Sequence, residues 1–178
     1  MIPKTPADRP RRRPPSAARG RGFTLIEAAW VTMIIGVGVI AMMELLAAGT
    51  VSNAASNQMT VAVNLANNVH EISLGLAYAD PAAPTQWSTR EATVAAYDDV
   101  ADLDGQTFSP PLDVRRQPIA GYPNWAQRVT VRTVSPDAVT AVRPNDITVP
   151  TARVTVEILL NGKVVHTATW LVVGPSPG

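Results

Sequence analysis

The chain has 178 residues, enough for one modest folded domain beside a long apolar segment. Its net charge of +1 conceals an asymmetry: residues 1–22 carry seven basic residues and one acid, and the remainder carries eight basic and 13 acidic residues. The absence of cysteine excludes a disulfide-stabilised scaffold. A basic head beside an apolar segment is typical of a cytoplasmic anchor, with the acidic remainder outside, and nucleic-acid binding is the alternative.

Residues 1–22 are rich in proline and arginine, which predicts a disordered leader. An apolar run follows from Ala28 to Ala48 and contains one charge, Glu44. As a helix, this run would rise roughly 30 Å, about one hydrocarbon core. A conventional secretory signal cleaved near Ala48 or Ala54 is the alternative. The length of the run, and the acid Glu27 immediately before it, argue against a conventional secretory signal.

The helix is expected to continue beyond the apolar run, from Thr24 to Tyr78, and to end before Asp80-Pro81 because the residue before proline avoids the α region. Small and apolar residues recur at helical spacing and predict a face that packs on a sheet: Ala55, Met59, Ala62, Ala66, Val69, Ser73 and Leu76.

Residues 80–124 are predicted to be mainly irregular. Four acids precede Gly105 in this region, namely Asp98, Asp99, Asp102 and Asp104. Only Asp102-x-Asp104-Gly105 matches a calcium loop, and no Glu follows at the required place. Asp102 and Asp104 are therefore weak metal candidates, and a solvated acidic turn is the favoured interpretation.

The last third alternates apolar and polar residues, which predicts half-buried strands over residues 125–134 and 152–160. Asn161-Gly162 predicts a two-residue type I′ hairpin turn. A regular register across that turn pairs Leu160 with Lys163, Leu159 with Val164, Ile158 with Val165, Val156 with Thr167 and Val154 with Thr169. The pair of Leu159 with Val164 lies on the face opposite to the other pairs, and that face also pairs Glu157 with His166 and Arg153 with Trp170. Because this face is not purely polar, a proline-rich loop or a neighbouring subunit would have to cover Trp170.

Little in the chain favours catalysis. The two histidines, His70 and His166, belong to no cluster with metal-ligand spacing, and the sequence contains no Ser-His-Asp set or glycine-rich phosphate loop. Arg128 and Arg132 on one strand face are too few for a nucleic-acid surface. We therefore expect no enzymatic activity, no cofactor and no nucleic-acid partner.

The segment Arg21-Gly22-Phe23-Thr24-Leu25-Ile26-Glu27, with the apolar run behind it, resembles the type IV prepilin signal. The resemblance implies that a prepilin peptidase cleaves between Gly22 and Phe23 and that Phe23 becomes N-methylated. It also implies that Glu27 pairs with the N-terminal amine of a neighbouring subunit during assembly. The order of residues in the run is more similar to minor pilins and to the I-subunit of type II secretion pseudopili than to major pilins.

The resemblance implies an α+β pilin-like fold, with a long N-terminal helix packed on a small antiparallel sheet. The expected divisions are a leader (1–22), a membrane and assembly helix (23–48), its amphipathic continuation (49–79), a loop region (80–124), a β region (125–174) and a tail (175–178). The expected function is a structural subunit, of the minor kind, of a type IV pilus or type II secretion pseudopilus. Such a subunit crosses the inner membrane once with its N-terminus in the cytoplasm, and its partners are other pilin or pseudopilin subunits. The alternative is a membrane-tethered extracellular binding or sensor domain that does not polymerise.

Overall fold

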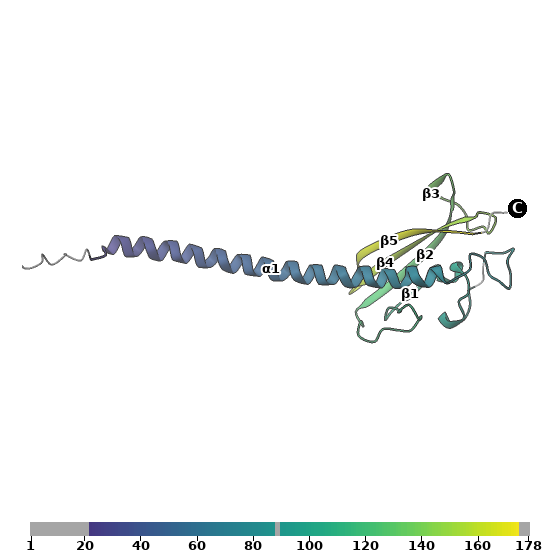
Figure 1. Cartoon of the computed structure of the whole chain (residues 1–178), viewed down its shortest axis with the longest axis horizontal. Helices are drawn as coiled ribbons and strands as arrows, with labels where there is room; N and C mark the ends of the chain where they lie inside the picture. The colour runs from purple at the N-terminus through teal and green to yellow at the C-terminus, as the bar shows by residue number, and fades with distance from the viewer. Residues whose placement is uncertain (1–21, 88–89, 175–178) are drawn as a thin grey trace, which may run out of the picture. The chain divides into compact units, whose positions relative to one another are not determined.

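The computed structural model describes residues 22–87 and 90–174. The predicted leader up to residue 21 and the predicted tail 175–178 lie outside the described residues. The elements are α1 (Leu25–Leu74), the 3-10 helices η1 (Val94–Ala96) and η2 (Val100–Leu103), and the strands β1 (Thr107–Phe108), β2 (Trp125–Ser135), β3 (Ala138–Val142), β4 (Thr151–Leu160) and β5 (Lys163–Val173) (Figure 1). The chain divides into two compact units, Met1–Ala48 and Gly49–Gly178.

In the first unit, α1 begins one residue after the expected start. Thr24 caps the helix, because its Oγ1 accepts a hydrogen bond from the Glu27 amide at 3.3 Å and its carbonyl accepts from Ala28. Glu27 lies in the first turn, where its negative charge interacts favourably with the helix dipole. Every residue from 22 to 48 is exposed, and the helix is long and apolar enough to cross a membrane.

In the second unit, α1 packs on the sheet along only part of its length. Residues 49–60 are exposed, and the buried residues are Ala62, Leu65, Ala66, Val69, Ile72 and Ser73. The predicted packing face is therefore correct from Ala62 to Ser73 and wrong at Ala55 and Met59, because the sheet does not extend far enough to cover these two residues. Helical spacing alone missed Leu65 and Ile72, which lie at the margins of the same face.

The helix ends at Leu74, so the prediction that it continues to Tyr78 is wrong. The Ala77 amide donates to the Asp98 carbonyl, and the Ala77 carbonyl accepts from the Val100 amide, both at 2.9 Å. These bonds replace the helical ones because Ala77 forms a parallel bridge with Asp99.

The sheet is antiparallel with strand order β1-β2-β4-β5, and β3 pairs with the end of β2. The predicted strands correspond to β2 and β4, and the region predicted as irregular also contains η1, η2 and β1. The alternating residues of both strands are buried, namely Trp125, Gln127, Val129, Val131 and Thr133 on β2 and Ala152, Val154, Val156 and Ile158 on β4. Val134, in the other phase of β2, is buried as well. The second half of α1 lies along this sheet (Figure 1), which confirms the α+β pilin-like fold.

The β4–β5 hairpin has the predicted turn but a different register. Asn161 and Gly162 have φ angles of 52° and 77°, as a type I′ turn requires. The first two pairs are as predicted, but a β-bulge then shifts the ladder by one residue. The remaining predicted pairs are therefore wrong. Ile158 pairs with His166, Glu157 with Thr167, Val156 with Ala168, Val154 with Trp170 and Arg153 with Leu171.

The bulge turns Trp170 toward α1. The Trp170 indole Nε1 donates to the Ser73 hydroxyl at 3.0 Å, and the His70 ring meets the Trp170 ring edge-on at 5.0 Å. Helix α1 therefore contacts Trp170, and the prediction that this side chain lies on the opposite face with Arg153 is wrong.

A single amide, Gln127, joins three parts of the second unit. It lies on β2 and is fully buried. Its Nε2 donates to the carbonyls of Leu65 in α1 (2.8 Å) and Leu112 in the loop (3.1 Å), and its Oε1 accepts from the Leu112 amide (2.7 Å). The loop, the helix and the sheet thus share one hydrogen-bonding side chain.

Candidate functional site

The residues of the prepilin-like signal lie together at the exposed start of α1. Phe23 has 78% of its surface exposed, and nothing lies within 4 Å of a Cβ added to Gly22. Glu27 is also exposed, one helical turn further on. The described part of the chain therefore leaves the Gly22–Phe23 bond accessible to an external protein.

The apolar half of α1 carries two acids, Glu27 and Glu44, and no basic side chain. The sequence has no Lys or Arg between Gly22 and Thr89. Within the described ranges, the ion pairs are Arg128–Glu157 at 2.8 Å and Arg132–Asp104 at 2.5 Å, and neither involves α1. Among the described residues, Glu27 therefore makes no ion pair.

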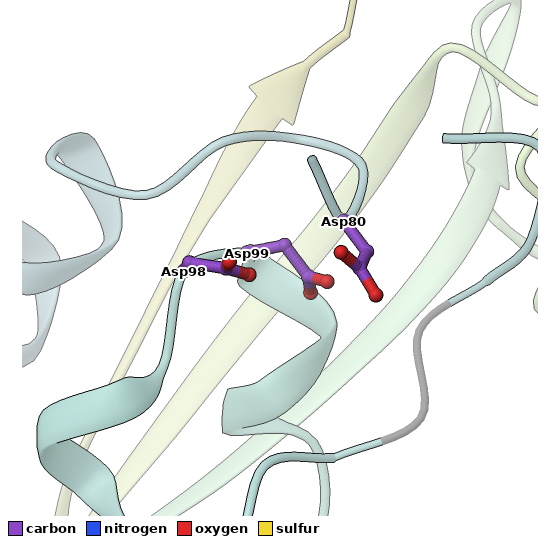
Figure 2. A group of neighbouring side chains, drawn as sticks. All are labelled: Asp80, Asp98 and Asp99. Carbon is purple, nitrogen blue, oxygen red and sulfur yellow. The ribbon is translucent and has the colours of Figure 1, made fainter. Parts of the chain in front are cut away.

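A group of acids lies where the loop after α1 meets η2. Figure 2 shows Asp98 and Asp99 at the start of η2 and Asp80 on the neighbouring loop, with the Asp99 and Asp80 carboxylates close together. One carboxylate oxygen from each of these three residues lies within 4.8 Å of the others, and Glu91, Asp98 and Asp102 form a second such group. By spacing alone, either group could hold a metal ion.

Backbone amides account for much of this acidic group. Asp99 Oδ1 accepts from the amides of Ala101 (2.6 Å) and Asp102 (3.3 Å), and Asp102 Oδ2 accepts from the amides of Asp98 (3.0 Å) and Asp99 (3.3 Å). This reciprocal pattern is a capping box at the N-terminus of η2. Asp80 Oδ1 likewise accepts from the Ala82 amide at 2.6 Å. The carboxylates therefore have a structural role in ending and starting local turns.

The two weak metal candidates have separate roles. Asp102 belongs to the capping box, whereas Asp104 Oδ1 accepts from the Val131 amide at 2.8 Å and the same carboxylate pairs with Arg132. Asp104 thus accepts a hydrogen bond from a backbone amide on the edge of β2 that none of the described strands pairs with at this point. Asn145 does the same further along the strand, since its Oδ1 accepts from the Thr133 amide at 3.2 Å.

Glu91 is the titratable group that the sequence did not single out. A side-chain hydrogen bond with Asp102, together with burial and the nearby charges of Asp102 and Asp98, raises the pKa of Glu91 to about 7. A carboxyl group that is hydrogen-bonded to a carboxylate retains its proton to higher pH, because ionising it would place two negative charges side by side. No sequence pattern joins Glu91 to Asp102, since 11 positions separate them and only the fold brings them together.

Among the described residues, neither histidine forms an ion pair with an acid. His70 packs against Trp170, and His166 lies opposite Ile158 rather than Glu157, whose carboxylate pairs with Arg128. Neither histidine belongs to the metal-ligand groups found among the described residues.

No protein-family model matches this chain, and neither the curated proteins nor the solved structures contain a significant match to it. The resemblance to prepilins is carried by Gly22, Phe23, Glu27 and the apolar helix that follows.

Proposed function

We propose that the chain is a structural subunit, of the minor kind, of a type IV pilus or a type II secretion pseudopilus, and that it has no catalytic role. A prepilin peptidase removes the leader by cleaving between Gly22 and Phe23, and Phe23 is then N-methylated. The mature chain resides in the inner membrane through the first half of α1, and its folded unit lies outside. It assembles with other pilin or pseudopilin subunits.

The observation that carries the proposal is that the apolar first half of α1 is fully exposed. All residues from 22 to 60 are exposed, and from Leu25 to Leu46 the large side chains are almost all apolar. Water is a poor environment for so much apolar surface. Lipid in the membrane, and the helices of neighbouring subunits in an assembly, are the two environments that suit it.

Glu27 distinguishes assembly from simple anchoring. In a chain that only anchors a domain, an acid on an apolar span is a burden of about 2.5–3.5 kcal/mol near the bilayer centre and less at its edge. In an assembly, the Glu27 carboxylate pairs with the Phe23 amine of a neighbour, which relieves both charges and fixes the axial register of the helices.

The test is the Glu27→Leu variant, compared with Glu71→Leu, which removes an exposed acid from the part of α1 that belongs to the second unit. We expect Glu27→Leu to be cleaved after Gly22 and to remain in the membrane, but to be lost from sheared filaments and from cross-links with partner subunits. Glu71→Leu should behave like the native chain in both assays. Native levels of Glu27→Leu in filaments and cross-links would defeat the assembly role and favour the membrane-tethered binding domain.

A further inference from the structure

The two acids of the apolar helix are separated by nearly the thickness of a membrane. Glu27 lies in the first turn of α1, and Glu44 follows 17 residues later, a rise of about 26 Å. From Leu25 to Glu44 the rise is about 28 Å, and the hydrocarbon core of a bilayer is about 30 Å thick. When one acid lies at one face of the bilayer, the other therefore lies close to the opposite face.

Glu44 has no compensating charge among the described residues. Its side chain is exposed, and within residues 22–87 and 90–174 it makes no ion pair. With no Lys or Arg between Gly22 and Thr89, the carboxylate is stabilised mainly by water or lipid headgroups. An acid in a span is least costly at the membrane boundary.

We infer that Glu44 marks the outer boundary of the membrane span and that the pair Glu27 and Glu44 fixes the depth of the helix. The hydrocarbon then covers residues 28–43, a rise of about 24 Å, and Glu27 and Glu44 lie at its two boundaries. If the helix slides outward, Glu27 enters the hydrocarbon, and if it slides inward, Glu44 does. This inference rests on the membrane residence given under the proposed function.

The competing placement is one helical turn deeper. Leu45 and Leu46 are apolar and 74% and 71% exposed, so hydrocarbon could extend to Ala48 and include Glu44. At the bilayer centre, the gain from inserting two leucines is smaller than the cost of inserting one carboxylate, and both quantities decrease toward the edge. The shallower placement is therefore favoured.

The chain contains no cysteine, so single cysteines can report depth without removing a native one. The full chain would be reconstituted in vesicles of phosphatidylethanolamine and phosphatidylglycerol and treated with N-ethylmaleimide. Thiols in hydrocarbon do not ionise and do not react. Labelling, read by mass spectrometry, is measured for variants with one cysteine at exposed helix positions: Val37→Cys, Ala41→Cys, Leu45→Cys, Ala48→Cys and Ser52→Cys.

We expect cysteines at 37 and 41 to be protected and cysteines at 45, 48 and 52 to react. Adding Glu44→Leu should move the boundary outward by about one turn, so that positions 45 and 48 become protected while 52 still reacts. Adding Glu71→Leu should leave the boundary unchanged. Protection at 45 and 48 with Glu44 present, or no movement on Glu44→Leu, would overturn the inference. Labelling at all five positions would instead defeat membrane residence, and with it the proposed function.

Discussion

Replacing Gln127 with methionine tests whether one buried amide holds the loop, the helix and the sheet together. Methionine has nearly the same length but can neither donate nor accept as the amide does. The Leu112 amide, which donates to Gln127 Oε1 at 2.7 Å in a buried setting, loses its partner.

The loss of stability in Gln127→Met depends on which hydrogen bonds remain to the backbone groups of Leu112 and Leu65. An orphaned buried donor costs about 1–3 kcal/mol, and each lost neutral hydrogen bond contributes about 0.5–1.5 kcal/mol. The Leu112 carbonyl still accepts from Asn68 Nδ2 at 3.1 Å, and Leu65 lies inside α1, so neither carbonyl is left alone. The orphaned amide therefore dominates, and we expect a loss of about 2–4 kcal/mol in the free energy of unfolding.

The assay is thermal unfolding of the whole chain in detergent micelles, followed by near-ultraviolet circular dichroism of the tryptophans. For a folded unit of this size the loss corresponds to a fall in Tm of roughly 10 °C. Gln86→Met, at an exposed position, is the matched control and should change the free energy of unfolding by less than about 0.5 kcal/mol. If Gln127→Met melts together with Gln86→Met, the hydrogen bonds of Gln127 do not support the fold in the way argued.

Four further changes have defined outcomes. Gly22→Leu should leave full-length precursor in the membrane, whereas the native chain should yield a mature N-terminus at methylated Phe23 by mass spectrometry; normal processing of the variant would contradict the cleavage site. Gly162→Val should cost on the order of 1 kcal/mol or more, because a β-branched residue resists the positive φ of the turn, and an unchanged Tm would count against that reasoning. Gly174→Ala should lower the free energy of unfolding by about 1–3 kcal/mol, the cost typical of overpacking, because an added Cβ would overlap the Tyr78 ring; an unaltered Tm would show that the ring can move aside. Since the pKa of Glu91 is raised from 4.5 to about 7, its stabilising contribution is complete below pH 4.5 and is lost as the pH rises through 7, so Glu91→Gln should flatten the fall in Tm between pH 5 and pH 8, and an identical pH profile would refute this.

The features that the sequence predicted correctly depend on neighbours within a few residues. The type I′ turn follows from Asn161-Gly162 alone, and the alternation of apolar and polar residues correctly predicted the strands β2 and β4. The long helix follows from its composition.

The features that the sequence did not predict depend on contacts between distant segments. The bulge in β5 allows Trp170 to bond Ser73, 97 positions away, and no local pattern encodes that contact. Similarly, helical spacing identified a packing face on α1 but could not show that the sheet ends short of Met59. In the candidate site, the resemblance to a prepilin signal comes from the sequence and stays a prediction, whereas the Glu91–Asp102 contact required the fold.

The bulge also determines which mutations the hairpin can tolerate. Because side chains alternate between the two faces, adding or deleting one residue between the turn and Thr169 would place Trp170 on the outer face of the sheet and remove its bond to Ser73. Substitutions at exposed positions such as Val164 leave that phase intact. We therefore expect this segment to vary in residue type but not in length among descendants of this chain.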